Sequence, residues 1–422
     1  MNSIRDFLYS EAGARARHKT RKRRSVFIDI HDIEPQSKKM PGVERDRFQT
    51  RVAQQLALAR RTAFKGDVAL KIDLTTTSKN APQAHTIAKN LLDLLSERRP
   101  DVPWPRKHLL YKDDRQIQAL SVTCRHGKSD PRISIEARPF KSMLDDLELA
   151  AEIIRKEDMS DDAWQREIYE EDWVKTFSDF RVNETEKRRI YGDSFYNNYI
   201  NLLRSSAQRE LLGRSGVNIP VLGWMFGRPS DIPLGFGAGG WAKLLGQSKL
   251  RLQVGELPIG KGSSETFKKA ISAEIAAFKK RWDWIIDPLV LAVGLEVVVR
   301  PNPATPSAVL HDLDNIVRDY LIPNIVPSFG TVTDQRWTID FDELRRISPD
   351  IADAWGPNPT PPISTKRGVT RYEVWRLPPI ANERGFVSVA IVADVDGTGD
   401  IIDNIDATIR RDGVKRLGRH IW

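Results

Sequence analysis

Two apolar stretches decide the fold of this chain: GDVALKIDLTTT, residues 66–77, and LVLAVGLEVVV, residues 289–299. The first alternates apolar and polar residues, and the second is almost continuously apolar and rich in valine, so both predict β-strands. A turn-rich segment and then a helical pattern follow each of them. The two stretches therefore indicate one order of elements that occurs twice along the chain.

The repeated order extends on both sides of these stretches. The first run, residues 26–140, is predicted to contain a strand (26–33), a helix (45–64), the strand of residues 66–77, a helix (82–95) and the strands QIQALSVTC and RISIEARP. The second run is predicted to contain the strand KLRLQVGELPIGKG, a helix (265–284), the strand of residues 289–299, a helix (313–321) and the strands YEVWRL and FVSVAIVAD. We expect an α+β fold in which each run forms a small mixed sheet with helices on one face. The two runs are expected to pair as an intramolecular pseudo-dimer.

These patterns divide the 422 residues into five segments. They are a basic N-terminal arm (1–24), a first α+β unit (25–141), a helical and then Gly- and Pro-rich connector (142–248), a second α+β unit (249–396) with an insertion at about 336–368, and a C-terminal tail (397–422). We predict that the connector is a spacer that fixes the placement of the two units.

The charge of the chain indicates a polyanionic partner. Lysine and arginine number 66 against 57 acidic residues, for a formal charge of +9, and residues 15–24 (RARHKTRKRR) contain seven basic residues in ten positions. Such a density attracts nucleic acid, although a solubilising tail has the same composition. The residues predicted to bind DNA are Arg15, Arg17, Lys19, Arg21, Lys22, Arg23, Arg24, Lys89 and Lys261.

Other function classes are disfavoured by the composition. No run reaches the roughly 20 apolar residues of a membrane span, and residues 1–24 have no apolar core of a secretory signal. The single cysteine, Cys124, cannot form a disulfide framework within one chain. We therefore expect a cytoplasmic protein without a membrane partner.

The most specific local pattern is HDLDN, residues 311–315, at the start of a predicted helix. Asp312, Asp314 and Asn315 offer only oxygen ligands, which favour Mg²⁺ or Mn²⁺ over zinc. Acidic residues in a first helical turn are also common capping groups, so the pattern alone allows a purely structural role.

The order of strand, Pro-rich turn, DLDN, helix and two further strands resembles the RusA family of Holliday junction resolvases. The resemblance implies a homodimeric, Mg²⁺-dependent endonuclease in which Asp312, Asp314 and Asn315 match the DxDN motif. Arg318 stands where the family usually has lysine. The family's D-D-x-Q motif, which supplies a further catalytic acid, is clear only in the first unit, as Asp113-Asp114-Arg115-Gln116.

The resemblance leaves the third acid of the site open. In the first unit, alignment on Lys89 puts Gln83, His85 and Thr86 at the DxDN positions, so that unit has lost its own motif. Either Asp334 completes the site of Asp312 and Asp314, or Asp114 completes it from across the pseudo-dimer, or neither does.

The resulting hypothesis is a magnesium-dependent, structure-specific endonuclease of branched DNA, of the kind used in DNA recombination and repair. The alternatives are a catalytically degenerate RusA-like subunit that binds branched DNA in a larger complex, and a scaffold whose arm binds RNA. An active form is expected as a homodimer or as part of a complex. The predicted catalytic residues are Asp312, Asp314, Asp334, Asp114 and Arg318, and the predicted metal ligands are Asp312, Asp314, Asn315, Asp334, Asp113 and Asp114.

Overall fold

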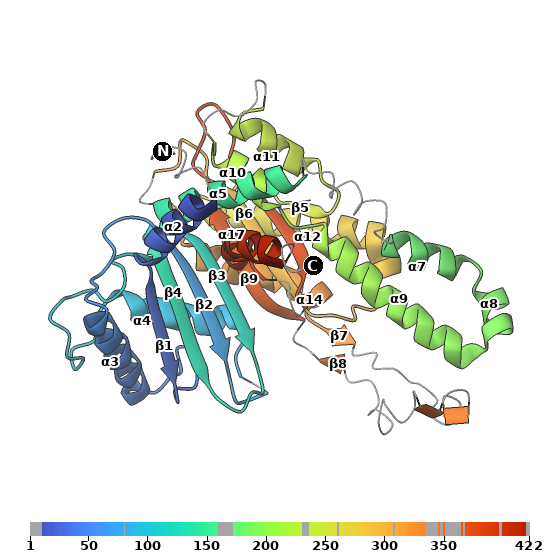
Figure 1. The fold of residues 1–422 in the computed structure, drawn as a ribbon, viewed down its shortest axis with the longest axis horizontal. Helices are drawn as coiled ribbons and strands as arrows, with labels where there is room; N and C mark the ends of the chain where they lie inside the picture. Colours follow the sequence, from blue (N-terminus) through green and yellow to red (C-terminus); the bar gives the residue numbers. More distant parts are fainter. Residues whose placement is uncertain are drawn as a thin grey trace.

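Eight strands form one mixed sheet in the order β1-β4-β2-β3-β9-β6-β10-β5 in the computed structural model (Figure 1). The structure describes residues 11–79, 81–158, 172–229, 236–259, 261–306, 309–333, 345–346, 349–350, 364–365, 368–395 and 399–418. The strands of the large sheet are β1 (Val26–His31), β2 (Val68–Thr75), β3 (Ile117–Arg125), β4 (Arg132–Pro139), β5 (Arg251–Gln253), β6 (Val293–Arg300), β9 (Val369–Arg376) and β10 (Phe386–Ala393). A separate two-stranded sheet joins β7 (Val332–Thr333) and β8 (Ser364–Thr365).

The order of strands is the same when it is followed inward from either edge. β2 and β3 are parallel, and β4 lies antiparallel between β1 and β2. In the other half β6 and β9 are parallel, and β10 lies antiparallel between β5 and β6. The halves meet where β3 and β9 pair antiparallel, with Ser121 opposite Glu373. The expectation of one small sheet per unit is thus corrected to one continuous sheet, in which β3 and β9 cover each other's otherwise exposed edge.

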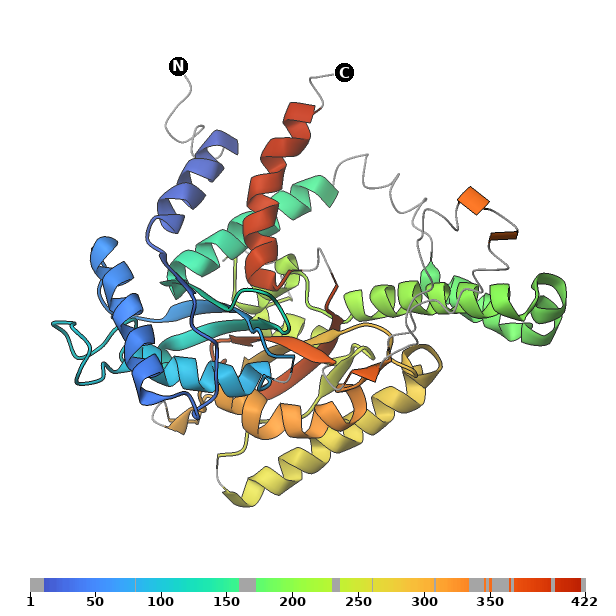
Figure 2. The same ribbon diagram turned by 90° about the horizontal axis from the view of Figure 1, so that it is seen from below.

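Helices cover both faces of the sheet, not one face as the sequence suggested (Figure 2). One face carries α3 (Gly42–Leu58), α4 (Ala84–Ser96), α12 (Lys261–Ile286), and the continuous stretch of α13 (Leu313–Asn315), η3 (Ile316–Leu321) and α14 (Ile322–Phe329). The other carries α2 (Glu11–Lys22), α5 (Phe140–Asp158), α10 (Ile219–Met225) and α17 (Ile401–Gly418). Every residue of β6 is buried. Successive residues of β9 face opposite sides of the sheet, so Val374 belongs to one apolar cluster and Trp375 to the other. This burial explains why β6 reads as a nearly continuous apolar run.

The C-terminal segment is a structural part of the fold and not a tail. Its helix α17 follows β10 as α5 follows β4, and the two helices pack together. The connector is largely helical and includes α7 (Trp173–Val182), α8 (Glu184–Tyr191), α9 (Asp193–Gly213) and α11 (Ala238–Gly246). Its helix α9 packs on β10 and its helix α10 packs on α5, so it contacts both halves. Among the described residues, no helix combines the length and the apolar character that crossing a bilayer requires.

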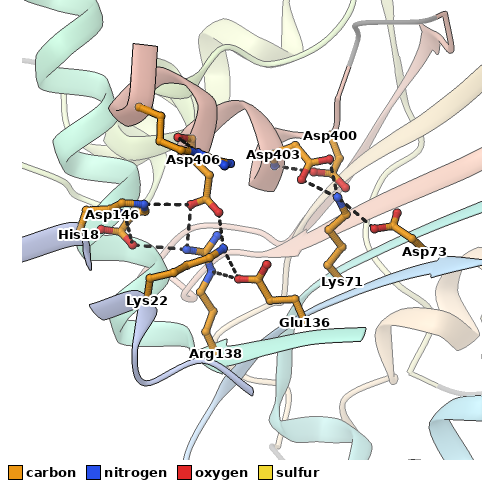
Figure 3. A network of polar contacts seen from close by, with 11 residues as sticks. His18, Lys22, Lys71, Asp73, Glu136, Arg138, Asp146, Asp400, Asp403 and Asp406 are labelled. Atoms are coloured by element: carbon orange, nitrogen blue, oxygen red, sulfur yellow. Dashed lines mark hydrogen bonds and ion pairs between the residues drawn. The ribbon is translucent and has the colours of Figure 1, made fainter. Parts of the chain in front are cut away.

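A buried charge network joins helices α2, α5 and α17 to the sheet (Figure 3). Arg138 of β4 lies 3.1 Å from the Asp406 carboxylate on α17 and 3.4 Å from the Asp146 carboxylate on α5. From α2, His18 lies 3.2 Å from Asp146, and Lys22 pairs with Asp406. The network therefore fixes α2, the helix that contains Arg15, Arg17 and Lys19, to the body of the protein.

This contact changes the interpretation of the basic N-terminal arm. Residues 11–22 form α2, and within it Arg21 pairs with Asp146 while Lys22 pairs with Glu136 and Asp406. Arg21 and Lys22 thus neutralise internal carboxylates, which disfavours the prediction that they bind DNA. Arg15 and Arg17 also lie in α2, and Lys19, Arg23 and Arg24 are exposed.

Replacing Arg138 by methionine is expected to lower the free energy of unfolding by about 3 kcal/mol, because it leaves two buried carboxylates short of a partner. Urea denaturation followed by circular dichroism measures this change. The matched control is Arg132→Met, which breaks an exposed pair with Asp29 and should cost less than about 1 kcal/mol. Equal losses in the two variants would contradict a structural role for the network.

Candidate metal centre

Asp312 and Asp314 lie where the chain leaves the loop after β6 and enters α13. Asp312 is the N-cap residue of α13, yet its side chain makes no capping hydrogen bond to the helix. Its Oδ2 instead accepts a hydrogen bond of 2.9 Å from the Asn315 amide. Asp314 is only 2% exposed. The capping role that the sequence allowed therefore does not account for Asp312.

Asp114 reaches the same place from the first half of the chain. It begins the short helix η1 (Asp114–Gln116), directly before β3, and β3 is the strand that pairs with β9 of the second half. Carboxylate oxygens of Asp114, Asp312 and Asp314 all lie within 4.8 Å of one another. Of the two acids considered for the third position, Asp114 therefore adjoins the pair, while Asp334 lies outside the described residues.

Lys89 of α4 contacts two of the three acids. Its Nζ lies 3.4 Å from Oδ2 of Asp114 and 3.4 Å from Oδ2 of Asp314, and 3.2 Å from Asp93. Burial alone would lower the pKa of Lys89, but Asp314, Asp114 and Asp93 outweigh it and raise that pKa above its usual value. Within the described parts of the chain, Lys89 makes the only ion pairs of the three clustered acids.

The acid cluster has more negative charge than its surroundings neutralise. Burial raises the pKa of Asp114 to about 6, and the charges of Asp314 and Asp312 add to the rise while Lys89 opposes it. Burial also raises the pKa of Asp314. Oδ1 of Asn315 is buried and accepts no hydrogen bond from the described residues, and the buried Oδ2 of Asp314 meets the Lys89 ammonium at 3.4 Å. Three carboxylates beside one ammonium group, with a buried amide oxygen free to coordinate, match the oxygen-rich coordination that Mg²⁺ or Mn²⁺ requires.

Arg376 of β9 ties together the loops that carry the acids. Its guanidinium donates hydrogen bonds to the carbonyl oxygen of His311, next to Asp312, and at 3.4 Å to that of Arg115, next to Asp114. No motif in the sequence indicated Arg376. Its signal was the alternation in YEVWRL, which puts a charged side chain on the buried face of a strand together with Tyr372 and Val374.

Two other predicted site residues point elsewhere. Asp113 is exposed, pairs with Arg115 at 2.7 Å and caps η1, so it stands apart from the acid cluster. Arg318 donates two hydrogen bonds to the Asp319 carboxylate, from Nε to Oδ1 at 2.7 Å and from Nη2 to Oδ2 at 2.8 Å. The close cation of the cluster is therefore Lys89, which was predicted from the sequence as a DNA-binding residue.

The lost motif of the first half lies near Arg318. Burial lowers the pKa of His85, and the charge of Arg318 lowers it further. His85 and Gln83 carry no carboxylate. Among the described residues, the cluster of three acids therefore forms at Asp312 and has no counterpart at His85.

Lys261, the remaining predicted DNA-binding residue, begins α12, and its side chain lies outside the described part. The turn before it adjoins the site, because His311 Nε2 donates to the carbonyl oxygen of Pro258 at 2.7 Å.

A second group of potential ligands differs in its charge balance. His18, Asp146 and Asp406 also lie within 4.8 Å of one another. Three cations, Arg21, Lys22 and Arg138, already pair with these two carboxylates. With Glu136, which also pairs with Lys22, three carboxylates face three cations, so no negative charge is left for a divalent ion. This group is an ion-pair network, and the acid cluster is the better metal site.

Comparisons with protein-family models, curated proteins and solved structures find no match for this chain. The resemblance to the RusA family consequently remains a prediction from the quoted motifs.

Proposed function

We propose that this protein is a magnesium- or manganese-dependent endonuclease of branched DNA, built from two fused RusA-like halves. The observation that carries the proposal is the cluster of Asp114, Asp312 and Asp314, to which both halves contribute. The matching strand order of the halves and the antiparallel β3–β9 contact support an intramolecular pseudo-dimer. The formal charge of +9 favours a polyanionic substrate.

The residues of the site have different roles in the proposed reaction. The three aspartates would hold a divalent cation, which when bound supplies Lewis-acid activation for cleavage of a phosphodiester. Lys89 limits the repulsion among the acids and adds a positive charge for the DNA phosphate. Arg376 holds the two loops that carry the acids at a fixed distance from each other, because it donates hydrogen bonds to both.

The described residues contain one complete cluster of three acids, and this has a consequence for the products. Resolution of a four-way junction requires two symmetric cuts, whereas the first half has Gln83 and His85 where carboxylates would be needed. A single chain should therefore make one nick at a branch point, and paired nicks should require two chains.

The test uses end-labelled four-way junction, fork, flap and linear duplex DNA with Mg²⁺, Mn²⁺ or EDTA. We expect cuts in branched DNA that need the metal, little cutting of linear duplex, and DNA binding that weakens steeply with salt. Selective binding to branched DNA without cutting would instead support a degenerate subunit of a larger complex. Preference for RNA over branched DNA would contradict both proposals.

A further inference from the structure

A cavity of about 730 Å³ opens beside the acid cluster, at the ends of β6 and β9. Its apolar wall includes Phe140, Phe226 and Pro378, and the two phenylalanine rings pack edge to face with centroids 5.7 Å apart. Gln118 and Asn302 add amide groups to the lining. The volume lies within the roughly 300–1,000 Å³ of small-ligand sites.

Two residues connect the cavity to the acid cluster. Arg376 lines the cavity and at the same time donates to the carbonyl oxygens of His311 and Arg115. Leu310, which also lines it, precedes Asp312 by two positions. A ligand in the cavity would therefore share a wall with the backbone that presents Asp114 and Asp312.

The charged groups of the lining favour an anion over a cation. Arg376 and Lys141 are basic, and Asp67 is the acidic residue of the lining. Arg228 also lines the cavity, but it pairs with two acids, Asp145 and Glu148. Two cations against one acid leave a positive balance without counting Arg228.

This combination of groups matches a nucleotide. A base has flat apolar faces that stack on aromatic rings and on proline, and a polar edge that amides can recognise. Its phosphate would meet Lys141 or Arg376. Enzymes that act on DNA often take a nucleotide out of the base stack, and this costs least where pairing is already interrupted, as at a branch point.

We propose that this cavity receives one unstacked nucleotide of the branched DNA, next to the phosphate that lies at the acid cluster. The inference rests on the proposed function, because it takes branched DNA as the substrate. It adds a specific contact through which the protein distinguishes a branch from continuous duplex, because unstacking a nucleotide costs less free energy where base pairing is already interrupted.

The test fills the cavity and then removes the base that the filling would exclude. Thr305 is a half-buried lining residue in a loop, and Thr305→Trp would occupy part of the space. Ala304→Trp is the matched control, because Ala304 is exposed and does not line the cavity. Both substitutions are made in the Asp314→Asn background, so that binding is measured without cutting, and circular dichroism checks the fold.

Binding is measured on fork DNA in which each nucleotide near the branch is replaced in turn by an abasic residue. We expect Thr305→Trp to weaken binding to intact fork DNA by about tenfold, within the range of one lost base-stacking contact, and Ala304→Trp to change it less than about twofold. On fork DNA that is abasic at one position, Thr305→Trp and the parent should bind equally, because the base that the tryptophan excludes is absent.

The outcomes separate this inference from the proposed function. Unchanged binding by Thr305→Trp, or a loss that no abasic position relieves, would overturn the nucleotide site and point to another occupant of the cavity. Cleavage by the wild type that Asp314→Asn abolishes would leave the nuclease standing in that case. A protein that binds no branched DNA would overturn both.

Discussion

Asp314→Asn is expected to reduce Mg²⁺-dependent cleavage of branched DNA by at least about a thousandfold, since a metal ion contributes several kcal/mol to such reactions and each 1.36 kcal/mol is a factor of ten. Asparagine keeps the shape of the side chain but removes the charge of a buried ligand that lies beside Asp114, Asp312 and the Lys89 ammonium. Initial rates on end-labelled junction DNA measure the effect.

Loss of folding would not explain this result. In the metal-free protein the substitution removes one of three close carboxylates, and Lys89 keeps its contacts with Asp114 and Asp93. The thermal midpoint should therefore stay level or rise. Asp319→Asn is the matched control, because Asp319 is an exposed acid five residues along the same helical stretch. Similar rates in Asp314→Asn and Asp319→Asn would contradict the proposed site.

Asp114→Asn should lower cleavage by about a hundredfold or more, although the residue belongs to the other half of the chain and is 200 positions from Asp314. The neighbouring substitution Asp113→Asn should leave the rate within about threefold of the wild type, since surface substitutions outside such features have small effects. Asp113 pairs with Arg115 and caps η1, and asparagine is itself a good capping residue. The same end-labelled assay compares the two variants.

The cleavage rates of Asp114→Asn and Asp113→Asn together show which of the two adjacent acids belongs to the site. Full activity in Asp114→Asn would indicate that the third carboxylate comes from elsewhere in the chain, with Asp334 the first residue to replace. A severe loss in Asp113→Asn would indicate that the whole D-D-x-Q segment acts together in a way that the geometry does not suggest.

Local patterns in the sequence were enough to predict the α+β class and most strands. β2 and β6 lie within the predicted stretches of residues 66–77 and, to one residue, 289–299, because alternation and valine-rich runs report burial directly. The union of the strands into one sheet was not predicted, since the pairing of β3 with β9 depends on contacts between residues some 250 positions apart. The helix α17 was missed for a similar reason, because its apolar residues are buried by contacts with α5 and the sheet, which are distant in sequence.

The candidate site was predictable where one short motif contains it. Asp312, Asp314 and Asn315 are adjacent in sequence, so a pattern identifies them together. The third acid stayed open because its position depends on how the halves meet, and Asp114 joins the cluster only through the β3–β9 contact. Arg376 acts through backbone carbonyls, which leave no signature in the residue types that they connect.

Binding of Mn²⁺ to the DNA-free protein, followed by electron paramagnetic resonance at pH 7.5, tests the central claim most directly. We predict one strongly held ion per chain, lost or greatly weakened in Asp114→Asn and Asp314→Asn and retained in Asp113→Asn. Because the pKa of Asp114 is about 6 in the metal-free protein, binding should weaken as the pH falls through 6, where a proton competes with the ion. Unchanged Mn²⁺ binding in Asp114→Asn would contradict a metal centre shared between the two halves.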